Sequence, residues 1–105
     1  GDFAKASVHL ARVVEADPKN GIGWFNYGLA LSRSQQFPKA ETALTRATTL
    51  APDNANAYAE LGYVQESLKK YKDALAAYER ANQLNPTPQL SEAIDRVKGV
   101  AAAAP

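Results

Sequence analysis

Apolar side chains along this chain recur at the spacing of one helical face. Within residues 21–34 they follow an i, i+3, i+4, i+7 pattern, which indicates an amphipathic α-helix. These positions are Trp24, Tyr27, Gly28 and Leu31. Residues 38–50 carry a stripe of Ala40, Leu44 and Ala47, and residues 72–84 carry Ala74, Tyr78 and Ala81. The pattern therefore predicts paired helices over 21–34 and 38–50, and again over 55–68 and 72–84.

The paired helices belong to a repeat of 34 residues that aligns without gaps. Three prolines mark the period, and aromatic, small and basic residues recur with them. The equivalent positions are Pro18, Pro52 and Pro86; Phe3, Phe37 and Tyr71; Ala6, Ala40 and Ala74; Leu10, Leu44 and Tyr78; Arg12, Arg46 and Arg80; Trp24 and Tyr58; Gly28 and Gly62; and Asn20 and Asn54. Internal repeats of this length are typical of stacked helical units.

Small and polar residues have clear local roles in each unit. Asn20 and Asn54 precede the first helices, where their side chains can accept hydrogen bonds from unpaired backbone N–H groups. Gly28 and Gly62 stand on the packing face despite a cost of about 0.5–1 kcal/mol for glycine in a helix. We therefore expect both glycines to lie where the two helices of a pair touch.

This pattern resembles the tetratricopeptide repeat family, on the segments GWFNYGLAL…FPKAETALTRATTLAP and AYAELGYVQ…YKDALAAYERANQLNP. The resemblance covers about residues 2–86 and implies an all-α solenoid of helical hairpins in a right-handed superhelix. Two departures stand out. Gln35 and Lys69 occupy the turn where the family usually has glycine, and a left-handed conformation there costs about 1–2 kcal/mol each. Gln65 replaces an apolar or aromatic residue, so looser packing is expected nearby.

We interpret residues 1–105 as a single repeat domain. Residues 2–18 match only the second helix of a repeat, 21–52 and 55–86 are complete repeats, 87–99 form a capping helix and 100–105 a tail. Thr87 is a suitable N-cap, and an apolar stripe follows it at Leu90, Ala93, Ile94 and Val97. Four polar residues, Glu92, Asp95, Arg96 and Lys98, are expected to face water. Gly99 is expected to end the helix.

The composition excludes several classes of function and indicates no reactive or metal-binding site. The chain has 12 basic and 11 acidic residues and a net charge of +1, so we predict neither a nucleic-acid nor a membrane partner. It contains no cysteine, and His9 is its single histidine, so we predict no metal site, no cofactor and no nucleophilic triad. We therefore predict that the chain is not an enzyme. Its localisation does not follow from the sequence.

The family resemblance implies a partner-binding surface on the first helix of each pair. The positions of this chain that match the family's binding surface are Ile22, Phe25, Leu29, Ser32 and Arg33 in one repeat, and Asn56, Ala59, Tyr63 and Glu66 in the next. The first hypothesis is a scaffold that holds a peptide or partner helix in the concave groove. Some relatives clamp the terminal carboxylate of a peptide with inward Lys, Arg and Asn. Asn26 fits that clamp, but Asn56 and Glu60 do not, so we reject this subtype.

Two further hypotheses concern the rest of the chain. The first helix of the partial repeat is absent, so the face that it would cover is expected to promote self-association. Its residues are Phe3, Leu10, Val13 and Val14. Alternatively, the array positions a further domain in a longer protein, which an adjoining catalytic motif would support.

Overall fold

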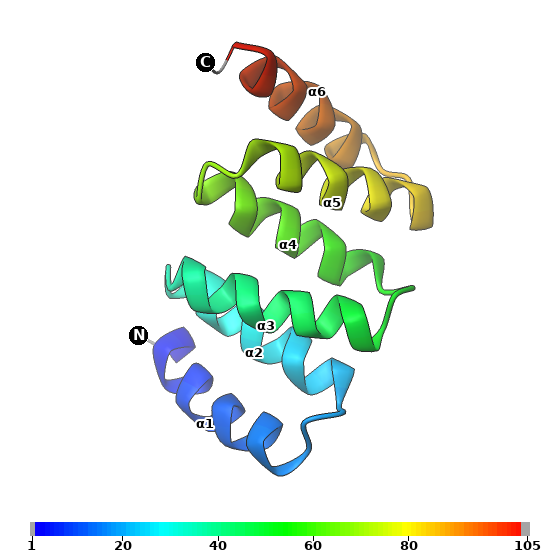
Figure 1. Cartoon of the computed structure of the whole chain (residues 1–105). Helices are drawn as coiled ribbons and strands as arrows, with labels where there is room; N and C mark the ends of the chain where they lie inside the picture. Colours follow the sequence, from blue (N-terminus) through cyan, green and yellow to red (C-terminus); the bar gives the residue numbers. More distant parts are fainter. Residues whose placement is uncertain (1, 104–105) are drawn as a thin grey trace. The chain divides into compact units, whose positions relative to one another are not determined.

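The computed structural model describes residues 2–103, and within that range all regular secondary structure is helical (Figure 1). The helices are α1 (Asp2–Ala16), α2 (Gly21–Arg33), α3 (Phe37–Leu50), α4 (Ala55–Ser67), α5 (Tyr71–Leu84) and α6 (Pro88–Ala103). The predicted all-α class is confirmed, and the predicted helix boundaries hold to within one or two residues for α2 to α5. No described helix combines the length and apolarity needed to cross a membrane.

The chain divides after Asp53 into two compact units. In the N-terminal unit (α1–α3), α2 packs against both α1 and α3. In the C-terminal unit (α4–α6), α5 packs against both α4 and α6. Each unit therefore contains one helical hairpin, α2–α3 or α4–α5, and one additional helix.

Side-chain caps fix where three helices begin. The Asn20 side-chain oxygen accepts a hydrogen bond from the Gly23 backbone N–H at 3.0 Å, and Asn54 accepts one from Ala57 at 3.1 Å. The Thr87 hydroxyl accepts from the Leu90 N–H at 3.1 Å. All three predicted caps are confirmed, and each satisfies a donor that the first helical turn leaves without a partner.

The turns within the hairpins adopt the conformation that glycine usually provides. Gln35 and Lys69 both have φ of 62°, in the left-handed region. At the first turn, the Gln35 N–H donates to the Ser32 carbonyl at 3.0 Å and the Gln36 N–H donates to the Leu31 carbonyl at 2.8 Å. This is the Schellman arrangement, and the second turn repeats it. The hydrogen bonds help to hold each turn despite the cost of a side chain at that position.

The two helices of each hairpin make a close contact at a glycine, as the repeat predicted. A Cβ atom added to Gly28 would lie 2.6 Å from Leu44 Cγ, and one added to Gly62 would lie 2.8 Å from Tyr78 Cδ1. The alanines that flank these contacts in α3 and α5 are fully buried. They are Ala40, Ala47, Ala74 and Ala81. Small residues on both helices therefore allow the close approach.

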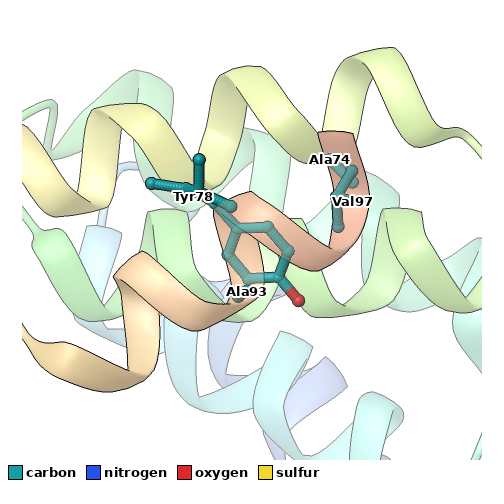
Figure 2. Close-up of a cluster of buried hydrophobic side chains, with 5 residues drawn as sticks. Ala74, Tyr78, Ala93 and Val97 are labelled. Atoms are coloured by element: carbon teal, nitrogen blue, oxygen red, sulfur yellow. The ribbon is translucent and has the colours of Figure 1, made fainter. Parts of the chain in front are cut away.

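Helix α6 covers α5 with its apolar stripe. Ala93, Ile94 and Val97 form a buried cluster with Ala74 and Tyr78, and Figure 2 shows Tyr78 beside Ala93. The expectation that Gly99 ends this helix is wrong, because α6 continues to Ala103. Gly99 lies in open space, and the alanines that follow have the highest helix propensity, so nothing local requires a turn. The last two residues of the predicted tail lie outside the described residues.

Candidate partner-binding surface

The predicted surface of the N-terminal unit lies on α2 and is largely apolar. Ile22 is 71% exposed, Phe25 and Leu29 are half-buried, and Arg33 is exposed. The i, i+3, i+7 spacing of Ile22, Phe25 and Leu29 places them along one helical face. Ser32 differs from the expectation, because it is 3% exposed. Position 32 is therefore part of the packed interior and presents no side chain to a partner.

The predicted surface of the C-terminal unit lies on α4 and is mixed in character. Asn56 is exposed, Ala59 is half-buried and Tyr63 is 45% exposed. Tyr63 is more exposed than Tyr58, which is half-buried. In α2, Trp24 and Phe25 are both half-buried. Trp24 keeps its Nε1 at the surface, where it donates to the Pro18 carbonyl at 2.8 Å.

Glu66, the last predicted position of the α4 surface, is engaged within the C-terminal unit. Its Oε1 accepts hydrogen bonds from the Tyr78 hydroxyl and from Arg96 Nη2, both at 2.8 Å. Its Oε2 accepts from Arg96 Nε at 2.8 Å. This bidentate ion pair joins α4 to α6, and the tyrosine hydroxyl adds α5. Glu66 therefore has a structural role within the C-terminal unit.

The three groups shift one another's protonation equilibria. The hydrogen bonds from Arg96 hold the pKa of the Glu66 carboxyl below its usual range, although partial burial opposes this effect. Burial, followed by the hydrogen bond to Glu66, raises the pKa of the Tyr78 hydroxyl. The hydrogen bonds to Glu66 raise the pKa of the Arg96 guanidinium. All three shifts favour the charged pair with a neutral tyrosine.

The sequence contains a signal for this cluster at three repeat positions. In the 34-residue alignment, Tyr78 replaces Leu44, Glu66 replaces Ser32, and Arg96 falls at the position of Gly28 and Gly62. Three polar replacements at positions that pack together indicate an interaction. Arg96 was expected to face water, and its side chain is 53% exposed, yet its guanidinium is bound to Glu66.

A hollow of about 270 Å³ lies in the C-terminal unit, at the opposite end of α4 from Glu66. It includes Asn56 and Ala59 from the predicted surface. The remaining lining residues come from α4, α5, α6 and the α5–α6 connection, and they are Ala55, Tyr78, Asn85, Thr87, Gln89, Leu90 and Ala93. The α4 surface thus ends in a concave site that the sequence did not predict.

Helix α1 carries the residues predicted to support self-association, and they differ in exposure. Phe3 is 51% exposed, and Leu10 and Val13 are half-buried. Val14 is only 3% exposed, so its assignment to an uncovered face is wrong. Its side chain belongs to the core of the N-terminal unit. Val8, which the sequence analysis did not single out, is 60% exposed.

Comparison with known proteins identifies the repeat. The tetratricopeptide repeat profile matches residues 28–87, which is more than half of the chain and includes the close-packed glycines and both inter-helix turns. The chain belongs to the tetratricopeptide repeat family. This tetratricopeptide repeat chain is 29% identical over 106 residues to an Hsp70-Hsp90 organizing protein of Triticum aestivum, matching 100% of this chain and 18% of that protein. It is 35% identical over 78 residues to tetratricopeptide repeat protein 28 of Mus musculus, matching 74% of this chain and 3% of that protein.

Solved tetratricopeptide repeat structures share the fold. The first such domain of Spaghetti (RPAP3), bound to the HSP90 peptide SRMEEVD, superposes with a TM-score of 0.91 at 25% sequence identity. The match covers 97% of this chain and 82% of that domain. This tetratricopeptide repeat chain therefore matches an interaction domain over almost its full length, while it spans less than a fifth of the two relatives named above.

Proposed function

We propose that this chain is a non-enzymatic protein-interaction module, which binds a segment of a partner protein on the first helices of its repeats. The observation that carries the proposal is the exposure of large apolar side chains on these helices, 71% for Ile22 and 45% for Tyr63. Exposed apolar side chains that line up on a helix favour a contact surface. The proposed contact residues form one face on each unit: Ile22, Phe25, Leu29 and Arg33 on α2 of the N-terminal unit, and Asn56, Ala59 and Tyr63 on α4 of the C-terminal unit.

The related RPAP3 domain, with its bound HSP90 peptide, supports a peptide or protein segment as the class of ligand. Recognition by this chain differs in its charges from a clamp for a terminal carboxylate. Neutral Asn56 and acidic Glu60 stand where such a clamp requires basic side chains, and a carboxylate near Glu60 would be repelled. Apolar contact at Phe25, Leu29 and Tyr63 is therefore the main source of affinity in this proposal.

The test uses peptides selected by the chain itself. A phage-displayed library of random peptides is enriched on the immobilised wild-type chain, and the enriched peptides are synthesised for titration. Aromatic anchors typically contribute about 2 kcal/mol, so Phe25→Ala and Tyr63→Ala should each weaken binding roughly thirtyfold. Val8→Ala, an exposed apolar position on α1, is the matched control. Equal affinity of all three variants would refute the proposed surface, provided that circular dichroism shows each one folded.

A second candidate function is self-association through α1. The exposure of Phe3 and Val8 favours it, because burial of each side chain is worth about 1.5–3 kcal/mol. Another copy of the chain is the partner in this hypothesis, in which α1 serves for assembly while α2 and α4 bind the partner segment.

A further inference from the structure

The hollow at the beginning of α4 has an unusual lining for a surface site, because it contains no charge. Of the residues that the structure describes there, none is acidic or basic. Its apolar part comes from Ala59, Leu90 and Ala93 and from the ring of Tyr78. Its polar part is mainly three exposed carboxamides, Asn56, Asn85 and Gln89. Charged residues make up 22% of the chain, so their absence from this lining gives the hollow a distinct chemistry.

This lining matches the chemistry of an extended peptide segment. A carboxamide both donates and accepts hydrogen bonds, so it can pair with backbone N–H and C=O groups alike. An apolar side chain would gain by leaving water for the apolar part of the hollow. A carboxylate or an ammonium group would lose hydration there and would find no opposite charge, which disfavours its entry.

The charged pair that joins α4 to α6 does not alter this preference. Arg96 lies on α6 beyond the hollow, but Nε and Nη2 of its guanidinium are bound to the two carboxylate oxygens of Glu66 at 2.8 Å. The pair is neutral as a whole, so it presents little net attraction to an acidic ligand.

We propose that this hollow binds an uncharged, apolar side chain from within a partner's extended segment, and that it disfavours an acidic chain terminus. The inference rests on the proposed function, since it names the class of partner for the α4 part of that surface. The carboxamides bind the segment's backbone, and the apolar floor takes one anchor side chain. Selectivity arises because a charged group in the anchor position has no compensating partner in the hollow.

The test compares defined peptides on the full ¹⁵N-labelled chain. The probes are acetylated and amidated nine-residue pools with flanks of Gly, Ser, Ala, Asn and Gln, and with Leu, Asp or Lys at the centre. The free acid SRMEEVD is the acidic probe. The readout is the movement of the side-chain amide signals of Asn56, Asn85 and Gln89 in ¹⁵N–¹H spectra. The Leu pool should move these signals at concentrations at least roughly tenfold lower than any of the charged probes.

A pair of variants tests the location of binding. Ala59→Leu fills the hollow and should weaken binding of the Leu pool at least roughly tenfold. Ala76→Leu places the same side chain at an exposed position of α5 outside this hollow, so it should leave binding unchanged. The same spectra verify that each variant is folded. Equal binding by Ala59→Leu and Ala76→Leu would overturn the assignment to the hollow.

The outcomes separate this inference from the proposed function. The inference is wrong if SRMEEVD or the Asp pool moves the three amide signals as readily as the Leu pool, or if the Leu pool leaves them unmoved. The function stands in either case if display-selected peptides still depend on Phe25 and Tyr63. Loss of that dependence, with the Leu pool still bound at the hollow, would refute the wider surface and leave the hollow as a separate peptide site.

Discussion

The missing side chain of Gly28 lets Leu44 of α3 lie against the backbone of α2. An added Cβ would be 2.6 Å from Leu44 Cγ and 3.3 Å from the Leu44 backbone nitrogen, so relief would require both the side chain and the helix to move. At Gly62 the neighbour is the ring of Tyr78, which is held at its hydroxyl by Glu66. Gly99 is different, because an added Cβ meets nothing within 4 Å.

These differences predict that replacing glycine with alanine has opposite effects on stability at Gly28 and at Gly99. Gly28→Ala should lower the free energy of unfolding by about 1–3 kcal/mol, because overpacking at the helix contact outweighs the gain in helix propensity. Gly99→Ala is the matched control and should raise it by up to about 1 kcal/mol, because only the propensity gain applies. Urea denaturation measures both. A more stable Gly28→Ala variant would show that α2 and α3 do not meet at this glycine.

At the scale of elements, the Glu66–Arg96 pair links the beginning and the end of the C-terminal unit. The pair spans 30 residues of sequence and joins α4 to α6, and the Tyr78 hydroxyl places α5 in the same network. Arg96 stands at the position of the packing glycines, where its large side chain is incompatible with the close helix contact seen at Gly28. Helix α6 thus occupies the place of a first helix in the 34-residue alignment, but it carries an arginine where α2 and α4 carry the packing glycine.

This link predicts an acid-sensitive contribution to stability. Because the folded state lowers the pKa of Glu66, the pair stabilises the chain fully above the ordinary value of 4.5. The contribution is lost as the pH falls through the lowered folded-state pKa. At pH 7, Glu66→Gln should cost about 1 kcal/mol or less, since Arg96 is half exposed. The wild-type advantage over Glu66→Gln should vanish on acidification.

A double-mutant cycle supplies the control for this prediction. In the Arg96→Gln background, Glu66→Gln should have a smaller effect on the urea midpoint than in the wild-type chain. Additive effects of the two substitutions at pH 7 would mean that the pair contributes nothing to stability.

For the whole molecule, the distribution of exposed apolar side chains motivates a hypothesis about contacts between copies of the chain. Among residues 2–103, the exposed large apolar side chains lie on α1, α2, α4 and α6, and they are Phe3, Val8, Ile22, Tyr63 and Val100. Two of the five lie on α1, which motivates the self-association hypothesis. Val14 cannot be used to test it, because this residue is buried and a charge there would unfold the N-terminal unit.

We expect reversible self-association at high micromolar concentration, and we expect the double variant Phe3→Ser/Val8→Ser to abolish it. The reason is loss of the apolar area that another copy would cover. Ile22→Ser is the matched control, since it removes an equally exposed side chain from α2. Light scattering over a concentration series measures the mass. A wild-type chain that stays monomeric throughout, or an Ile22→Ser variant that alone loses association, would contradict assembly through α1.

The sequence by itself determined the features that rest on local chemistry and on the period. The 34-residue repeat placed the helices, the caps at Asn20 and Asn54, and the close contacts at Gly28 and Gly62, while the family resemblance indicated the left-handed turns at Gln35 and Lys69. Each depends on backbone hydrogen bonds or side-chain size within one hairpin. Each of these features occurs in both repeats, which argues against a chance match between the two segments.

Only the tertiary structure determined which individual side chains are buried and which ones interact with each other. The burial of Ser32 and Val14 depends on packing around them, which helical periodicity does not specify. The engagement of Glu66 by Arg96 depends on three helices meeting, and the uncharged hollow collects residues from three helices and a connection. Gly99 remained helical because no contact or cap required a turn. Side-chain partners far apart in sequence are fixed by the packed helices, so a repeat pattern predicts the helices without determining which distant side chains interact.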